Sequence, residues 1–212
     1  MVLGHALEVG DLFLAAGFVA GHHILKAHLA LGCLGLGLPD TGLFLALLAR
    51  LGRALEAGTG FQLGELWVES FSTPHDAAGS VGYAVTGGGA RMALATDLGH
   101  LTPQVWDAAR GADLLVCETN HDEDWVRSGP YPYALQNRIL GDRGHLSNEA
   151  SAEFAVSLAA AGTHTLLLAH LSPENNTPER ARTVVQGALE RAHLRPEVDV
   201  LPRDECSLCY EV

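Results

Sequence analysis

Basic side chains are scarce in this sequence. The 212 residues include 13 lysines and arginines against 25 aspartates and glutamates, which gives a formal net charge of −12. Proteins that hold nucleic acid on a broad basic face neutralise its phosphates with Lys and Arg, so this composition disfavours that class. The charge is compatible with a nuclease that holds its phosphate through metal ions and histidines.

Cysteine is also sparse, with only Cys33, Cys117, Cys206 and Cys209. Four scattered cysteines are too few for the disulfide framework of a small secreted domain. Cys206 and Cys209 have the C-x-x-C spacing of metal or redox sites, but with no second pair we interpret them as part of an inert tail. Cys117 lies in an apolar stretch and is interpreted as a buried packing residue.

No long apolar run suggests a membrane span. The stretches 12–20 and 29–38 are too short or too rich in glycine, and no positively charged segment of a signal peptide opens the chain. We therefore expect a cytoplasmic protein without membrane attachment. An amphipathic, membrane-attached segment within residues 12–48 ranks last among the alternatives, because glycines interrupt every candidate helix.

The composition changes near residue 46. Overall, 48% hydrophobic and 18% charged residues indicate an ordered domain with a sizeable core. Residues 1–45, however, hold four charged side chains in a Leu/Gly/Ala-rich background without a period of 2 or 3.6. We predict an atypical N-terminal segment at 1–45 and one domain at 46–212.

Strand and helix patterns alternate from residue 46 onward, which predicts an α/β layered domain. Expected helices begin at Thr102-Pro103, at Ser147 or Asn148, and at Thr177-Pro178, since each start combines a capping side chain with a suitable first turn. The expected strands are 66–72, 81–85, 92–96, 113–118, 165–169 and 197–201, with a turn at 87–89 and a helix remnant at 47–54.

Polar side chains follow the predicted strands at the points where each ends. They are His75, Asp97, Glu118, Asn120, His121 and His170. Strand ends on one edge of an α/β sheet converge, so these groups can share a site. Two histidines with a bridging aspartate are typical of a two-metal hydrolytic site. Taken singly, each has a simpler interpretation as a turn, cap or surface residue, and the same holds for His145.

The order and the amino-acid sequences of these motifs identify a protein family more specifically than any single residue does. The sequence reads FSTPHDA at 71–77, ATDLG at 95–99, ETNHD at 118–122, GPYP at 129–132, GHLSN at 144–148 and AHLS at 169–172. This series resembles the metallo-β-lactamase superfamily. More closely, it is similar to bacterial YycJ/WalJ-type members, relatives of ribonuclease Z and phosphodiesterase-like enzymes.

The resemblance implies an αββα sandwich and a pair of Zn²⁺ or Mn²⁺ ions. It implies that His75 and His170 each bind one ion, that Asp97 bridges both, and that His145 donates a proton near the leaving group. Asn120, His121, Asn148 and Asn176 would contact substrate, with Asn120 and His121 near its phosphate or behind the ligands. The implied reaction is hydrolysis of a phosphodiester, in DNA or RNA, by a metal-bound hydroxide.

The family's main signature, His-x-His-x-Asp-His, is missing from the chain. The nearest cluster contains His22, His23 and His28 but no aspartate. We expect that residues 1–45 do not represent the family's usual N-terminus and that the remaining ligands form half of a site. A catalytically impaired remnant or a binding module is therefore the alternative. The oligomeric state is open, with a homodimer as one candidate.

Overall fold

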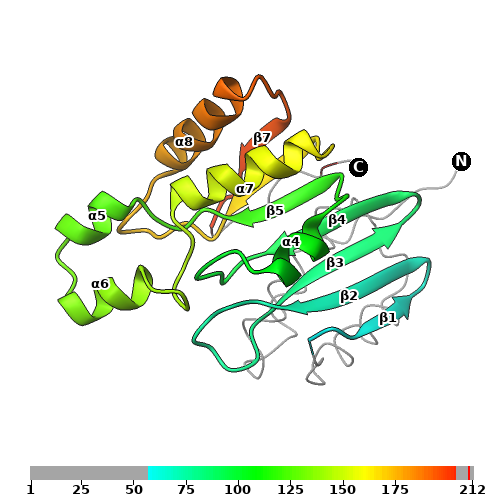
Figure 1. Ribbon diagram of the computed structural model, residues 1–212, viewed down its shortest axis with the longest axis horizontal. Helices are drawn as coiled ribbons and strands as arrows, with labels where there is room; N and C mark the ends of the chain where they lie inside the picture. Colours follow the sequence, from blue (N-terminus) through cyan, green and yellow to red (C-terminus); the bar gives the residue numbers. More distant parts are fainter. Residues whose placement is uncertain (1–56, 204–209, 211–212) are drawn as a thin grey trace, which may run out of the picture.

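The structure is a computed structural model that describes residues 57–203 and 210. In this part of the chain, one seven-stranded mixed sheet carries helices on its flank (Figure 1). The elements are β1 Gly60–Leu63, β2 Leu66–Ser72, β3 Val81–Gly87, β4 Ala90–Ala95, α4 Pro103–Ala109, β5 Leu114–Glu118, α5 Glu123–Ser128, α6 Tyr133–Ile139, α7 Asn148–Ala160, β6 Thr165–Ala169, α8 Pro178–Arg191 and β7 Glu197–Val200.

The strands lie side by side in sequence order. Strands β1 to β4 form an antiparallel meander, and β4 to β7 are parallel. Helices occupy the connections between the parallel strands, as parallel pairs require. Since β3 runs opposite to both neighbours, β2 points the same way as β4, β5 and β6. The carboxyl ends of these four strands therefore lie at one edge of the sheet.

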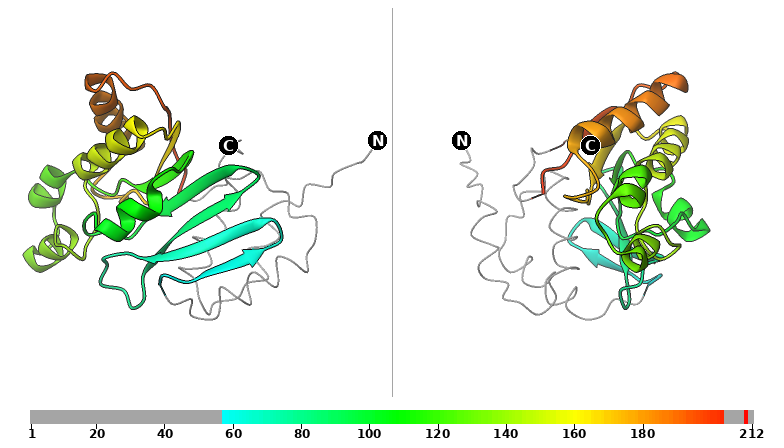
Figure 2. Two further views of the ribbon diagram at one scale, coloured as in Figure 1. Left: turned by 45° about the vertical axis from the view of Figure 1, so that its right-hand side comes forward. Right: turned by 90° about the vertical axis from the view of Figure 1, so that its left-hand side faces the viewer.

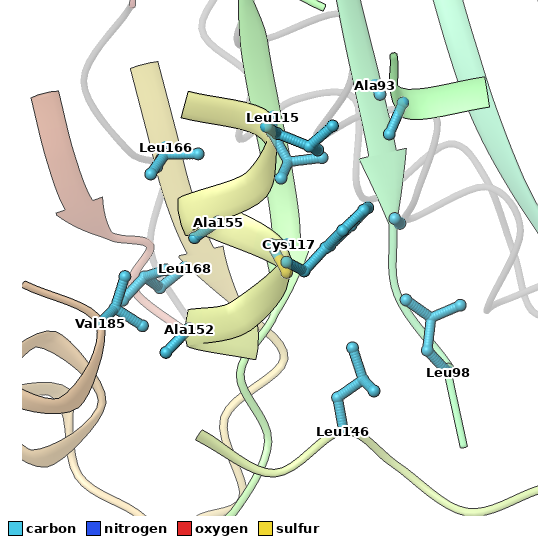
Figure 3. Packing of buried hydrophobic residues seen from close by; sticks show 14 of the residues in the cluster. Ala93, Leu98, Leu115, Cys117, Leu146, Ala152, Ala155, Leu166, Leu168 and Val185 are labelled. Atoms are coloured by element: carbon cyan, nitrogen blue, oxygen red, sulfur yellow. The ribbon is translucent and has the colours of Figure 1, made fainter. Parts of the chain in front are cut away.

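Side chains alternate between two buried clusters, one on each face of the sheet. Leu94 and Val116 belong to one cluster, whereas their neighbours Ala95 and Cys117 belong to the other. Helices α4, α7 and α8 lie on the same side of the sheet (Figure 2). The small side chains of Ala152 and Ala155 let α7 lie close to the strands, over residues such as Cys117 (Figure 3).

The helix-start predictions are confirmed. Thr102, Ser147 and Thr177 are N-cap residues whose side chains accept hydrogen bonds from backbone N–H groups three residues on. Ser147 rather than Asn148 caps α7. That helix ends at Ala160, just before Gly162, whose φ of 117° suits a residue without a side chain.

The predicted strands are confirmed within one or two residues, but β1, α5 and α6 are absent from the predictions. Strand β1 has only four residues and begins at Gly60. Helices α5 and α6 are six and seven residues long, and α6 contains no buried residue, so neither carries the apolar period that marks a helix.

Three predictions fall on residues outside the described part: the helix remnant at 47–54, the Cys206–Cys209 pair and the atypical segment 1–45. Within the described part, none of the helices is both long and apolar enough to cross a bilayer. The cytoplasmic location stays a prediction.

Candidate metal centre

Four polar side chains lie at the edge of the sheet where β2, β4, β5 and β6 end. His75 lies three residues beyond β2, and Asp97 lies two residues beyond β4. Glu118 is the last residue of β5, and His170 directly follows β6. Parallel pairing of β4, β5 and β6 thus explains why side chains far apart in sequence converge here.

Asp97 lies between the imidazoles of His75 and His170. Its Oδ1 is 3.8 Å from Nε2 of His75 and 3.7 Å from Nε2 of His170. Two ligands of one tetrahedral zinc ion, each about 2.0–2.1 Å from the metal, lie about 3.4 Å apart. The spacing of Asp97 from each imidazole nitrogen is close to this value, so Asp97 could share an ion with either histidine.

The second nitrogen of each imidazole is fixed by an acceptor. Nδ1 of His75 lies 2.9 Å from the carbonyl oxygen of Gly144, and Nδ1 of His170 lies 2.6 Å from Oε1 of Glu118. A carbonyl only accepts, so His75 donates from Nδ1 and presents the lone pair of Nε2 towards Asp97. Outer acceptors of this kind are typical of metal-binding histidines. The described donors therefore fit a zinc- or manganese-type ion.

Glu118 is the centre of the hydrogen-bond network behind these imidazoles. Besides His170, its Oε1 lies 2.7 Å from Nδ1 of His145, and its Oε2 accepts from the backbone N–H of Leu98 at 2.6 Å. The side chain is fully buried. Burial alone raises the pKa of a carboxyl group, but the hydrogen bonds and charges of His145 and His170 hold the pKa of Glu118 at about 2.

Asp97, Glu118, His145 and His170 each offer one ligand atom within 4.8 Å of the others, which makes them a candidate metal-binding group. Oε1 of Glu118, however, already accepts from both imidazoles through their Nδ1 atoms. We therefore interpret Glu118 as the support of His145 and His170 rather than as a direct ligand.

In the sequence, Glu118 is a polar residue at a predicted strand end with no predicted role. A carboxylate at the end of the otherwise apolar strand LLVCE could have indicated a functional role. A charged side chain buried in such a strand needs hydrogen-bonding or charged partners.

His145 lies between His75 and His170. Its ring centroid is 4.7 Å from that of His75 and 5.2 Å from that of His170. With Nδ1 directed to Glu118, Nε2 is the nitrogen available to a bound molecule. The structure thus brings together the four residues His75, Asp97, His145 and His170, while their roles stay predictions.

The remaining predicted residues lie behind the imidazoles. Nδ2 of Asn120 donates to the carbonyl of His170 at 2.7 Å. His121 is buried, and its Nδ1 has no hydrogen-bond partner among the residues that the structure describes. Burial lowers the pKa of His121 to about 4. The chain at His121 pairs with the His145 loop, since Asn148 N–H donates to the His121 carbonyl.

Asn148 and Asn176 are buried and bonded to each other. Nδ2 of Asn176 donates to Oδ1 of Asn148 at 2.7 Å, and Nδ2 of Asn148 donates back at 3.2 Å. Asn176 also donates to the carbonyl of Thr119 at 2.9 Å. The pair ties the start of α7 to the loop after β5. A substrate contact by either side chain stays a prediction.

Comparison with known proteins identifies the family of this chain. A family profile described as "Beta-lactamase superfamily domain" matches residues 43–171, which is more than half of the chain. The chain belongs to the metallo-β-lactamase superfamily. The α/β prediction of that fold is therefore confirmed, with the seven-stranded mixed sheet and its helices as the described part of it.

Two curated relatives are similar in sequence. The chain is 39% identical over 127 residues to exodeoxyribonuclease YycJ of Bacillus anthracis, covering 60% of this chain and 48% of the relative. It is 36% identical over 144 residues to exodeoxyribonuclease WalJ of Streptococcus pneumoniae, covering 68% of this chain and 54% of the relative. The chain thus spans about half the length of the curated relatives that it matches.

Among solved structures, the metallo-β-lactamase fold protein YhfI from Bacillus subtilis is similar, with a TM-score of 0.51 and 17% identity. The match covers 69% of this chain and 51% of YhfI. At this identity the likeness shows the fold alone.

Proposed function

We propose that the chain is a metal-dependent hydrolase that cleaves phosphodiester bonds, with DNA as its substrate class. The observation that carries this proposal is the convergence of Nε2 of His75 and Nε2 of His170 on Oδ1 of Asp97, with His145 beside them. The names of the YycJ and WalJ relatives support DNA over other phosphodiesters.

His75, Asp97 and His170 would hold Zn²⁺ or Mn²⁺. When bound, such ions lower the pKa of a coordinated water and neutralise charge on the phosphate oxygens. Asp97 is almost completely buried, so its negative charge is a strong anchor for a cation.

His145 would transfer a proton to the leaving oxygen of the cleaved bond. Glu118 fixes the ring through Nδ1, so Nε2 faces outward and is the atom at which the proton is held and released. The two carboxylates thus divide the work: Asp97 faces the cation, and Glu118 orients the histidines.

The second candidate is a catalytically impaired remnant or binding module of the same fold. It is favoured by one observation, the absence of His-x-His-x-Asp-His from all 212 residues. Three ligands shared between two ions leave each ion under-coordinated, which lowers its affinity.

One experiment separates the two candidates. The purified chain is stripped of metal, reloaded with Zn²⁺ or Mn²⁺, and assayed for bound metal, melting temperature and cleavage of bis(p-nitrophenyl) phosphate and single-stranded DNA. The hydrolase proposal expects at least one ion per chain and cleavage that His75→Ala and Asp97→Ala abolish. His164→Ala serves as the matched control, because His164 is exposed and outside the site. A folded chain that neither binds metal nor is stabilised by it supports the remnant instead.

A further inference from the structure

The end of α6 and the short segment that follows it lie against the loop that carries His75. We call residues 138–145 the strap. It runs from the end of α6 to His145, and its backbone folds on itself through Gly144 N–H to the Gly141 carbonyl at 2.8 Å and His145 N–H to the Ile139 carbonyl at 3.0 Å.

Arg143 of the strap binds the His75 loop from two directions. Its side chain donates from Nε and Nη2 to the carbonyl oxygen of His75, at 3.3 Å and 3.0 Å. Its own carbonyl accepts from the N–H of Asp76 at 3.0 Å. Arg143 thus holds both polar atoms of the single peptide group that joins His75 to Asp76, its carbonyl oxygen and its N–H.

A second contact joins the same two segments. Arg138 donates to Asp76 from both Nε and Nη2, with Nη2 3.1 Å from Oδ1. This pair is partly exposed, and isolated exposed ion pairs contribute little to stability. Its two-pronged geometry nevertheless fixes the direction in which the strap meets the loop.

The strap also carries the group that orients His75. The carbonyl of Gly144 accepts from Nδ1 of His75, and the next residue along the strap is His145. A side chain at Gly144 would collide with the backbone of Ile139, so the tight turn that presents this carbonyl needs glycine. Any shift of the strap therefore moves the acceptor of His75 and the ring of His145 together.

We infer that Arg143 is a positioning residue that holds the Gly144 carbonyl against His75 and so sets both the tautomer of His75 and its distance from His145. Only the effect of this positioning on catalysis rests on the proposed function. The hydrogen bonds that orient His75 are made by the protein's own groups, the Gly144 carbonyl and the Arg143 side chain. Arg143 does not touch the reacting atoms; it acts through the Gly144 carbonyl and the peptide of His75.

The test is nitrogen-15 NMR of the histidine rings in the metal-free full chain, combined with a zinc titration against a chelator. In the wild type we expect His75 to be protonated on Nδ1. In Arg143→Ala we expect a mixture of Nδ1-H and Nε2-H forms and a zinc affinity reduced by about 10- to 100-fold, the range for loss of an outer support. Arg143→Lys, which keeps one donor, is expected to restore part of both.

Arg127→Ala is the matched control, because Arg127 is an exposed arginine whose ion pair with Glu123 lies within α5. Unchanged His75 tautomer and zinc affinity in Arg143→Ala would overturn the inference. If that variant does not fold, Arg138→Ala loosens the strap from an exposed position and is expected to shift the same two signals by a smaller factor. No shift in a folded Arg138→Ala would then count against the inference.

Neither readout uses substrate, so the two proposals fail separately. A wild-type chain that cleaves no phosphodiester but shows the tautomer change in Arg143→Ala would remove the proposed function and leave the positioning role in place.

Discussion

Oε1 of Glu118 lies 2.7 Å from Nδ1 of His145, at the end of a strand whose other side chains are all apolar. The same oxygen also accepts from His170. One buried carboxylate therefore orients both the imidazole proposed to bind a metal ion, His170, and the imidazole proposed to move a proton, His145.

Replacing Glu118 with glutamine keeps the shape of the side chain and removes its charge. We expect the cleavage rate at neutral pH to fall by about 100-fold, the scale of general acid catalysis, because charge-assisted hydrogen bonds to His145 become neutral ones. Single-turnover assays on metal-loaded protein measure this. Glu153→Gln on the exposed face of α7 is the control, and an equal loss in both variants would contradict the role of Glu118.

The Asn148–Asn176 pair predicts a stability effect rather than a change in KM alone. Replacing either residue with alanine leaves a buried amide without its partner, at a cost of about 1–3 kcal/mol. The double variant is expected to cost less than the sum, with a coupling of at least about 0.5 kcal/mol. Urea unfolding of the three variants checks both values. Strictly additive losses would show that the two amides do not support each other.

Two glycine-to-alanine substitutions are expected to change the stability of the protein in opposite directions. A Cβ at Gly99 would collide with the backbone of Asp142 in the strap, so Gly99→Ala should destabilise the protein by about 1–3 kcal/mol. A Cβ at Gly187 in the middle of α8 meets only the end of the Arg191 side chain at 3.4 Å, so Gly187→Ala should stabilise by up to about 1 kcal/mol. Thermal unfolding of both variants measures the difference.

Asp199 predicts a pH-dependent contribution away from the site. Its partial burial raises the pKa, but hydrogen bonds from Tyr210 and Arg182 outweigh burial and place the pKa below the ordinary 3.8. A carboxylate with a lowered pKa stabilises the folded state above pH 3.8, and this contribution disappears as the pH falls further.

Asp199→Asn should therefore cost about 1 kcal/mol at pH 7, since the side chain is partly exposed, and progressively less below pH 4. Urea unfolding between pH 7 and pH 3 follows the difference from wild type. A difference that grows on acidification would reverse the sign and contradict this account.

Much of the fold was readable from the sequence because its signals are local. The caps at Thr102, Ser147 and Thr177 and the apolar run before Glu118 each specify their own element. Helices α5 and α6 were not predicted because they are six and seven residues long and lack a periodic apolar face.

The site divides in the same way. His75, Asp97 and His170 were predictable because each follows a strand that ends at the same edge. The grip of Arg143 on the His75 carbonyl was not, because the two residues are 68 positions apart and a backbone acceptor leaves no mark on the sequence. Distances within a site depend on the whole fold and not on its motifs.

Asp97 and His170 both have a φ of 59°, in the left-handed region that side chains rarely adopt. Each such position costs roughly 1–2 kcal/mol that glycine would not incur. If laboratory evolution selected the chain for thermal stability alone, substitutions to glycine would be expected at these two positions. A lineage that keeps aspartate and histidine there under selection for activity would show that the cost is retained for chemistry.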